Sequence, residues 1–218
     1  MTETSKKLKS LVIASILGDG YLSKQRNRGN YLEIQHSNKQ LEYLKWKKKR
    51  FQEEGISCNI YDLPKYKASK IQLYGGKFNG INLRHSLYPN NNKTISRRFL
   101  NMLDEEGLAI WFMDDGGVCF SKRKGGQISG RYLKISTYCF NYAEHIILQR
   151  YFRNVWGINP QIKMDKGKYY WLKFNATEAN KLIPIIRPYI HPTLQYKIDL
   201  KYKERLRSNE QPRNRLIV

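Results

Sequence analysis

The chain has few cysteines and histidines for its length. Three cysteines and four histidines are scattered over 218 residues, and no two cysteines form a CxxC pair. A structural zinc site and a disulfide framework are therefore not expected, and the composition fits a reducing compartment, either a bacterial cytosol or an organelle. Cys58 and Cys139 stand among apolar residues, so both are expected to be small core residues.

Long apolar runs are also missing. No stretch of about 18 apolar residues occurs, so the sequence predicts no helix that spans a membrane. The first ten residues, MTETSKKLKS, lack the apolar segment of a signal peptide. Hydrophobic residues still make up 40% of the chain, which is enough to build a core.

Acidic residues are scarce relative to basic ones. Eighteen Asp and Glu stand against 40 Lys and Arg, which gives a formal net charge of +22. Because a charge of this size repels itself, it predicts a polyanionic partner. Nucleic acid is the first candidate, and an anionic membrane surface is the second.

The sequence contains an internal repeat. LVIASILGDG (residues 11–20) resembles LAIWFMDDGG (residues 108–117), and NYLEIQHS (residues 30–37) matches RYLKISTY (residues 131–138). Further matches follow in the same order in both halves. We therefore expect two copies of one unit of roughly 100 residues, an N-terminal repeat over residues 1–102 and a C-terminal repeat over residues 103–218.

Each copy is predicted to run α-β-β-α-β-β-α. In the first copy, helical spacing covers residues 7–18, 39–53 and the region near 80–88, with strand-like alternation between them. In the second copy, the expected helices are residues 108–114, 142–155 and 178–186. Strands are expected from residues 118 and 131 onward and over residues 161–164 and 169–175. The fold class is thus α+β, with helices behind two antiparallel sheets.

The alternation along the strands separates an apolar face from a polar, basic and aromatic face. Leu32, Ile34 and His36 share one face, whereas Tyr31, Glu33 and Gln35 share the other. Antiparallel ribbons fit the major groove of DNA, where Arg, Lys and Gln read base edges. The candidate DNA contacts are Lys24, Arg26, Arg28, Tyr31, Glu33, Gln35, Lys70, Gln72, Lys122, Arg123, Lys134, Ser136, Lys163, Trp171 and Lys173.

The two helical motifs that end in Asp-Gly resemble the LAGLIDADG motif of homing endonucleases, and the two-copy layout resembles the monomeric, pseudo-symmetric type. The resemblance extends from about Leu8 to Lys197. It implies a doubled αββαββα fold that places a saddle of two sheets on DNA. It also implies Mg²⁺-dependent cleavage of both DNA strands, in the service of intron or mobile-element homing.

If the two motif helices pack against each other, Asp19 and Asp115 lie together at their C-terminal ends. Helix C-termini disfavour carboxylates, so a divalent cation such as Mg²⁺ is expected to compensate them. The resemblance places Gly18 and Asp114 at the metal site as well, with the role of Asp114 left open. It also makes Lys93 and Lys197 catalytic candidates near the scissile phosphates. Gln35 and Ser136 are weaker candidates for positioning a water molecule.

Two other functions remain open at this stage. The same basic, aromatic surface suits RNA, so an intron-splicing maturase of this fold is an alternative. A DNA-binding regulator without cleavage fits less well, because it would not need paired carboxylates. No long flanking segment carries intein splicing residues, so a free-standing or intron-encoded protein is expected rather than an intein.

Overall fold

A computed structural model describes residues 4–23, 31–74, 84–125 and 127–201 of the chain, without the side chain of Lys122. The first half contains α1 (Lys6–Leu17), β1 (Gly20–Ser23), β2 (Tyr31–Ser37), α2 (Leu41–Glu53), β3 (Cys58–Leu63), β4 (Ala68–Leu73), α4 (Arg84–Leu87) and α5 (Arg97–Leu100). The second half contains α6 (Glu105–Asp115), β5 (Gly116–Lys122), β6 (Ile128–Ile135), α7 (Tyr142–Trp156), β7 (Gln161–Asp165), β8 (Tyr169–Phe174), α8 (Ala176–Ile186) and the 3₁₀ helix η5 (Pro192–Lys197).

Two antiparallel sheets repeat the same topology. Their strand orders are β1-β2-β4-β3 and β5-β6-β8-β7. The register also repeats, because Gly20 pairs with Ile34 in the first sheet and Gly116 pairs with Ile135 in the second. The predicted α+β class with two αββαββα units is therefore confirmed. The division at residues 102 and 103 falls between α5 and α6, and it stays a prediction as a domain boundary.

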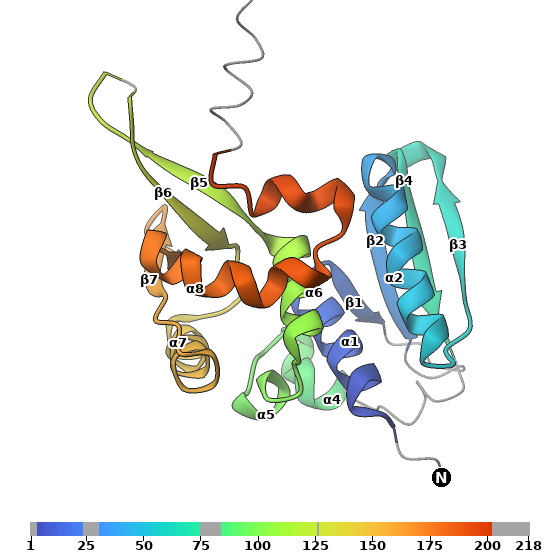
Figure 1. Cartoon of the computed structure of the whole chain (residues 1–218). Helices are drawn as coiled ribbons and strands as arrows, with labels where there is room; N and C mark the ends of the chain where they lie inside the picture. The colour runs from blue at the N-terminus through green and yellow to red at the C-terminus, as the bar shows by residue number, and fades with distance from the viewer. Residues whose placement is uncertain (1–3, 24–30, 75–83, 126, 202–218) are drawn as a thin grey trace, which may run out of the picture.

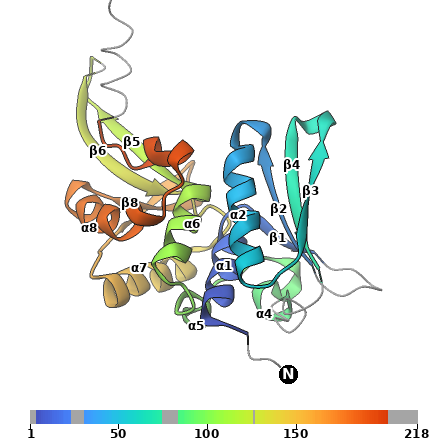
Figure 2. The same cartoon turned by 45° about the vertical axis from the view of Figure 1, so that its right-hand side comes forward.

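The helices α1 and α6 form the centre of the molecule. Figure 1 shows them side by side, with the first sheet and α2 on one side and the second sheet, α7 and α8 on the other. Figure 2 shows the same arrangement after a turn of 45°. Both helices are buried nearly all round, which matches their continuous apolar sequences. A side-chain cap begins each helix. The Ser5 side chain accepts from the Leu8 N–H at the start of α1, and the Asp104 side chain accepts from the Gly107 N–H at the start of α6.

Each sheet buries one face against helices. Along β2 the odd-numbered side chains are part-buried or exposed, whereas Leu32, Ile34 and His36 are buried, as the alternation predicts. In the second sheet Leu133, Ile135 and other apolar side chains of β6 and β8 form the corresponding buried face. The opposite faces of both sheets therefore remain available for a partner.

Other expectations have mixed outcomes. The helix predicted near residues 80–88 corresponds to α4 (Arg84–Leu87) in the described part of the chain. The beginning of the predicted range, up to residue 83, lies outside the described residues. Cys58 is buried as expected, but the expectation for Cys139 is wrong: it is exposed in the loop after β6, beyond the alternating segment. Within the described ranges, no helix has the length and apolar character needed to cross a membrane.

Candidate active site

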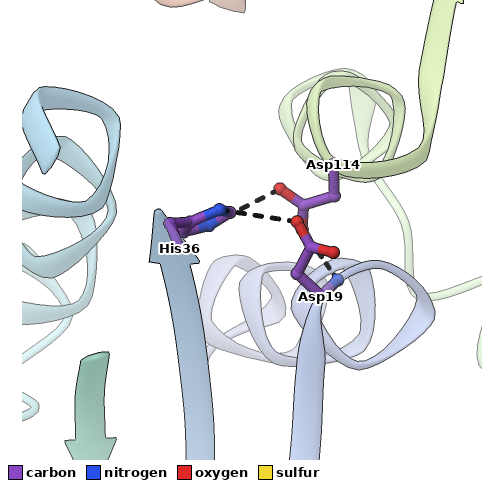
Figure 3. A group of neighbouring side chains, drawn as sticks. All are labelled: Asp19, His36 and Asp114. Carbon is purple, nitrogen blue, oxygen red and sulfur yellow. Dashed lines mark hydrogen bonds and ion pairs between the residues drawn. The ribbon is translucent and has the colours of Figure 1, made fainter. Parts of the chain in front are cut away.

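The two acidic motifs meet where α1 and α6 end. Asp19 follows the C-cap Gly18 of α1, and its backbone N–H donates to Asp114 Oδ2 at 3.3 Å (Figure 3). Asp114 and Asp115 are the last two residues of α6. The side chain of Asp19 is 40% exposed, and Asp115 is half-buried. The structure thus brings the three carboxylates into one centre between the repeats.

The carboxylates in this centre oppose one another electrostatically. Burial, followed by the charges of Asp114 and Asp19, raises the pKa of Asp115 to about 7. The pKa of Asp19 is also raised, first by burial and then by Asp114. Closely spaced carboxylates that repel one another, with hard oxygen donors and some solvent access, fit a divalent cation such as Mg²⁺ or Mn²⁺.

Asp114 differs from its two neighbours because its carboxylate is already held by cationic and hydroxyl donors. Its side chain is fully buried, and both carboxylate oxygens lie 2.7 Å from Lys47 Nζ. The Tyr43 hydroxyl donates to Asp114 Oδ1 at 2.9 Å, and burial, followed by the charge and contact of Asp114, raises the pKa of Tyr43. Asp114, Asp19 and His36 do form a group with closely spaced potential ligand atoms. The Lys47 ammonium, however, occupies the place of a cation at the Asp114 carboxylate.

His36 lies beside both aspartates, with one ring nitrogen toward each. Its Nδ1 is 3.4 Å from Asp19 Oδ2 and its Nε2 is 4.0 Å from Asp114 Oδ1 (Figure 3). Burial, and then the charge of Lys47, lower the pKa of His36 to about 4. The imidazole is therefore neutral at physiological pH.

Gly18 sets how closely the two helix ends approach. A Cβ added at Gly18 would lie 2.5 Å from Asp114 Cβ and closer still to Asp114 Oδ2. Near the other end of the contact, a Cβ added at Gly107 would overlap Ser10 Oγ. The small residues Gly18 and Gly107 thus allow the close approach of α1 and α6, although Ile110 and Trp111 are buried alongside them.

Lys93 and Lys197 occupy matched places in the two repeats. Lys93 Nζ donates to the carbonyls of Leu17 at 3.1 Å and Gly18 at 3.3 Å, at the end of α1. Lys197 Nζ donates to the carbonyls of Met113 and Asp114, the latter at 3.2 Å, at the end of α6. Burial lowers the pKa of Lys197. The structure therefore places both lysines beside the carboxylate centre.

The open face of the second sheet carries alternating basic and aromatic side chains. Lys134 Nζ lies 4.6 Å from the centre of the Trp171 ring, and Lys173 Nζ lies 4.4 Å from that of Tyr132. Lys163 is exposed on β7. Ser136 follows β6 and donates its N–H to the Asp115 carbonyl at 2.9 Å.

The open face of the first sheet is more strongly cross-linked. Glu33 Oε2 accepts from Lys70 at 2.9 Å and from Gln72 at 2.6 Å, and Tyr31 stacks on Tyr74. Gln35 is exposed. Lys24, Arg26 and Arg28 fall outside the described residues. Arg123 is exposed in the turn after β5.

Three residues of the centre were not expected from the sequence: Lys47, His36 in this role, and Tyr43. Tyr43, Lys47 and Phe51 are spaced four residues apart and are all buried on one face of α2. That spacing is the signal that could have separated Lys47 from the other basic residues of the same helix.

Doubled αββαββα units, with acidic helix ends meeting between two four-stranded sheets, define the LAGLIDADG endonuclease fold. The model of the LAGLIDADG DNA endonuclease family matches residues 9–182. The chain therefore belongs to that family and is a site-specific DNA endonuclease.

Individual relatives agree with this assignment. A probable intron-encoded endonuclease of Wickerhamomyces canadensis is 27% identical over 204 residues, which cover 90% of this chain and 86% of that protein. The homing endonuclease I-WcaI, bound to its DNA recognition sequence, matches with a TM-score of 0.70 and 24% identity over 91% of this chain and 88% of that chain. An I-DmoI variant, solved with its nicked target DNA in the presence of Mn, matches with a TM-score of 0.51 and 14% identity over 87% and 100% of the two chains. These two structures share the fold with this chain.

Proposed function

We propose that this chain is a monomeric, Mg²⁺-dependent homing endonuclease that cuts both strands of a long, nearly asymmetric DNA site. The observation that carries the proposal is the meeting of two acidic helix ends, one from each repeat, with a lysine beside each. One helix end for each strand explains why a single chain needs both copies of the motif.

In this proposal Asp19 and Asp115 hold divalent cations. The backbone carbonyls of Gly18 and Asp114 are further candidate ligands, because they lie at the same helix ends and each oxygen has a second lone pair besides the one that accepts from Lys93 or Lys197. A divalent cation bound here supplies activation of a water molecule and stabilisation of the leaving oxygen. Its charge also offsets the repulsion that raises the pKa values of both carboxyl groups.

Lys93 and Lys197 neutralise charge that develops on the scissile phosphates. Both ammonium groups are anchored by helix-end carbonyls and so are pre-oriented at the centre. A preorganised positive charge stabilises the transition state without reorganisation during the reaction. Exposed or part-buried side chains of the two open sheet faces, including Gln35, Gln72, Lys134 and Lys163, contact the bases and phosphates.

The test is cleavage of a randomised duplex library in the presence of Mg²⁺, followed by sequencing of the cut ends. The matched variants are Asp19→Asn and Asp115→Asn. Each should abolish double-strand cleavage of the selected site but leave DNA binding within about tenfold of the wild type, since the sheet faces carry the binding. Robust cleavage in EDTA would refute the cation mechanism. A large loss of binding in both variants would show that these residues maintain the fold.

The splicing-cofactor alternative stays a prediction. Adding a structured intron RNA to the same preparation, with and without the selected DNA as competitor, would show whether RNA uses the same basic surface.

A further inference from the structure

A chain of buried polar groups lies beneath Asp19 and crosses from one repeat to the other. It consists of Asp114 on α6, Lys47 on α2 and His36 on β2. The exposed fractions of these three side chains are 0%, 1% and 1%. Buried charges are costly unless they are paired and hydrogen-bonded, so each of these contacts constrains the others.

The hydrogen-bond donors of Lys47 determine which nitrogen of the His36 ring carries the proton. The ammonium has three N–H donors and no acceptor, and its neighbours are the two Asp114 oxygens at 2.7 Å and His36 Nε2 at 3.3 Å. His36 Nε2 must therefore accept, which places the ring proton on Nδ1. That N–H faces Gln40 Oε1 at 3.1 Å and Asp19 Oδ2 at 3.4 Å.

We infer that His36 and Lys47 are positioning residues for Asp19: Lys47, held by Asp114 of the second repeat, orients His36 so that its Nδ1–H faces Asp19 Oδ2. The inference rests on the proposed function, because the carboxylate so oriented is the one that holds a cation. The Nδ1–H has its shorter contact with Gln40 Oε1 at 3.1 Å, which fixes the ring, and its position 3.4 Å from one Asp19 oxygen favours the carboxylate orientation that leaves the other oxygen for the ligand. Partners behind a ligand commonly set its orientation in this way.

Among the described residues of the second repeat, the matched positions do not carry an equivalent Asp–Lys–His group. The repeat alignment puts Gly18 opposite Asp114 and Thr137 opposite His36. The buried positions of α2 and α7 put Leu148 opposite Lys47. Thr137 instead pairs with His145 at 2.7 Å. Only the Asp19 half of the centre is oriented through a buried lysine and histidine, so disturbing them should affect the two DNA strands unequally.

Two substitutions at His36 separate positioning from simple packing. The amide N–H of Asn can occupy the place of Nδ1, whereas that of Gln occupies the place of Nε2. We expect His36→Asn to cut both strands within about threefold of the wild-type rate, and His36→Gln to cut one strand at least about tenfold more slowly than the other. The measurement is single-turnover cleavage of the library-selected duplex, labelled on each strand, at saturating protein and Mg²⁺. Thr137→Val is the control in the second repeat and should not reproduce the pattern.

A double variant tests the parts played by Lys47 and Asp114. Lys47→Leu with Asp114→Gly copies the residues that the repeats carry at the matched positions, so no buried charge is left unpaired. It should fold and bind the selected DNA like the wild type yet show the strand imbalance of His36→Gln. If His36→Asn and His36→Gln behave alike, or if the double variant cuts both strands at the wild-type rate, the inference is wrong. Absence of Mg²⁺-dependent cleavage by the wild type would instead refute the proposed function.

Discussion

Asp115 is the residue through which this centre responds most strongly to pH. Its carboxyl group has a pKa of about 7, against 3.8 for the unperturbed group. Between these two values the folded chain binds a proton that the unfolded chain has released. The stability associated with that proton is present at low pH and is lost as the pH rises through about 7. A cation would bind the ionised carboxylate of Asp115. Its binding would therefore stabilise the folded chain more as the pH rises, which opposes the loss of stability on ionisation.

We expect Ca²⁺ to raise the Tm more at about pH 8 than at about pH 5.5, because at the lower pH the cation must displace the proton of Asp115. Differential scanning calorimetry without DNA measures the effect apart from cleavage. Asp115→Asn is the control and should remove most of the difference between the two pH values. An equal Tm shift at both pH values in the wild type would show that Asp115 does not face the cation.

Among single residues, the sequence identifies those that lie in the repeated motif better than those that lie outside it. Asp19 and Asp115 stand before glycine in both motifs, and the structure brings them together. Lys47 stands among basic residues that read as a solvated helix face, yet it is buried against Asp114. Its role depends on which helix faces which across the repeats, and no local pattern contains that information.

The proposed catalysis depends on the ends of α1 and α6, and a lysine contacts the terminal carbonyls of each helix. We expect Lys93→Met and Lys197→Met each to slow cleavage by about 100-fold with little loss of DNA binding, because a preorganised charge is removed from the transition state. Nicked product should accumulate if the two strands are affected unequally. Single-turnover assays on each labelled strand measure this, and Lys45→Met on the exposed face of α2 is the control. Wild-type rates on both strands in both variants would make these lysines structural caps only.

The contact between the same two helices predicts a stability effect. In Gly18→Ala the new methyl group would overlap Asp114, so we expect a destabilisation of about 1–3 kcal/mol and reduced cleavage. Gly117→Ala is the matched control, because an added Cβ there meets nothing within 4 Å. Urea unfolding monitored by fluorescence gives both values. Equal stability of the two variants would mean that the helix ends separate without cost.

Sequence patterns predict the long elements well. The amphipathic α2 and α7 and the alternating strands match their expected ranges within a few residues. The two motifs predict that α1 and α6 pack together, but they do not specify that Gly18 meets Asp114. Packing of this kind depends on the tertiary register of two helices, which composition alone does not determine.

The whole molecule has a charge of +22, and basic side chains occur on both open sheet faces. Binding of DNA should therefore release counterions, with a slope of about −0.9 in log K against log salt for each neutralised phosphate. We expect a slope of about −4 or steeper by fluorescence anisotropy with the selected duplex. Lys134→Met should make it shallower by about one unit, whereas Lys181→Met, on α8, should not. An affinity that does not depend on salt would exclude this account of the charge.

The unequal helix ends of the two repeats also limit the evolutionary and engineering routes open to this chain. A homodimer of first repeats would bring glycine against glycine and leave two copies of Lys47 without the Asp114 carboxylate, and a homodimer of second repeats would leave two copies of Asp114 without the Lys47 ammonium. Either assembly would carry uncompensated charge in its core. Each half of the present chain therefore depends on a charge that the other half supplies, and neither half is expected to form a stable symmetric dimer by itself. A chimaera made with half of a related enzyme should succeed only when the incoming half supplies the complementary charge.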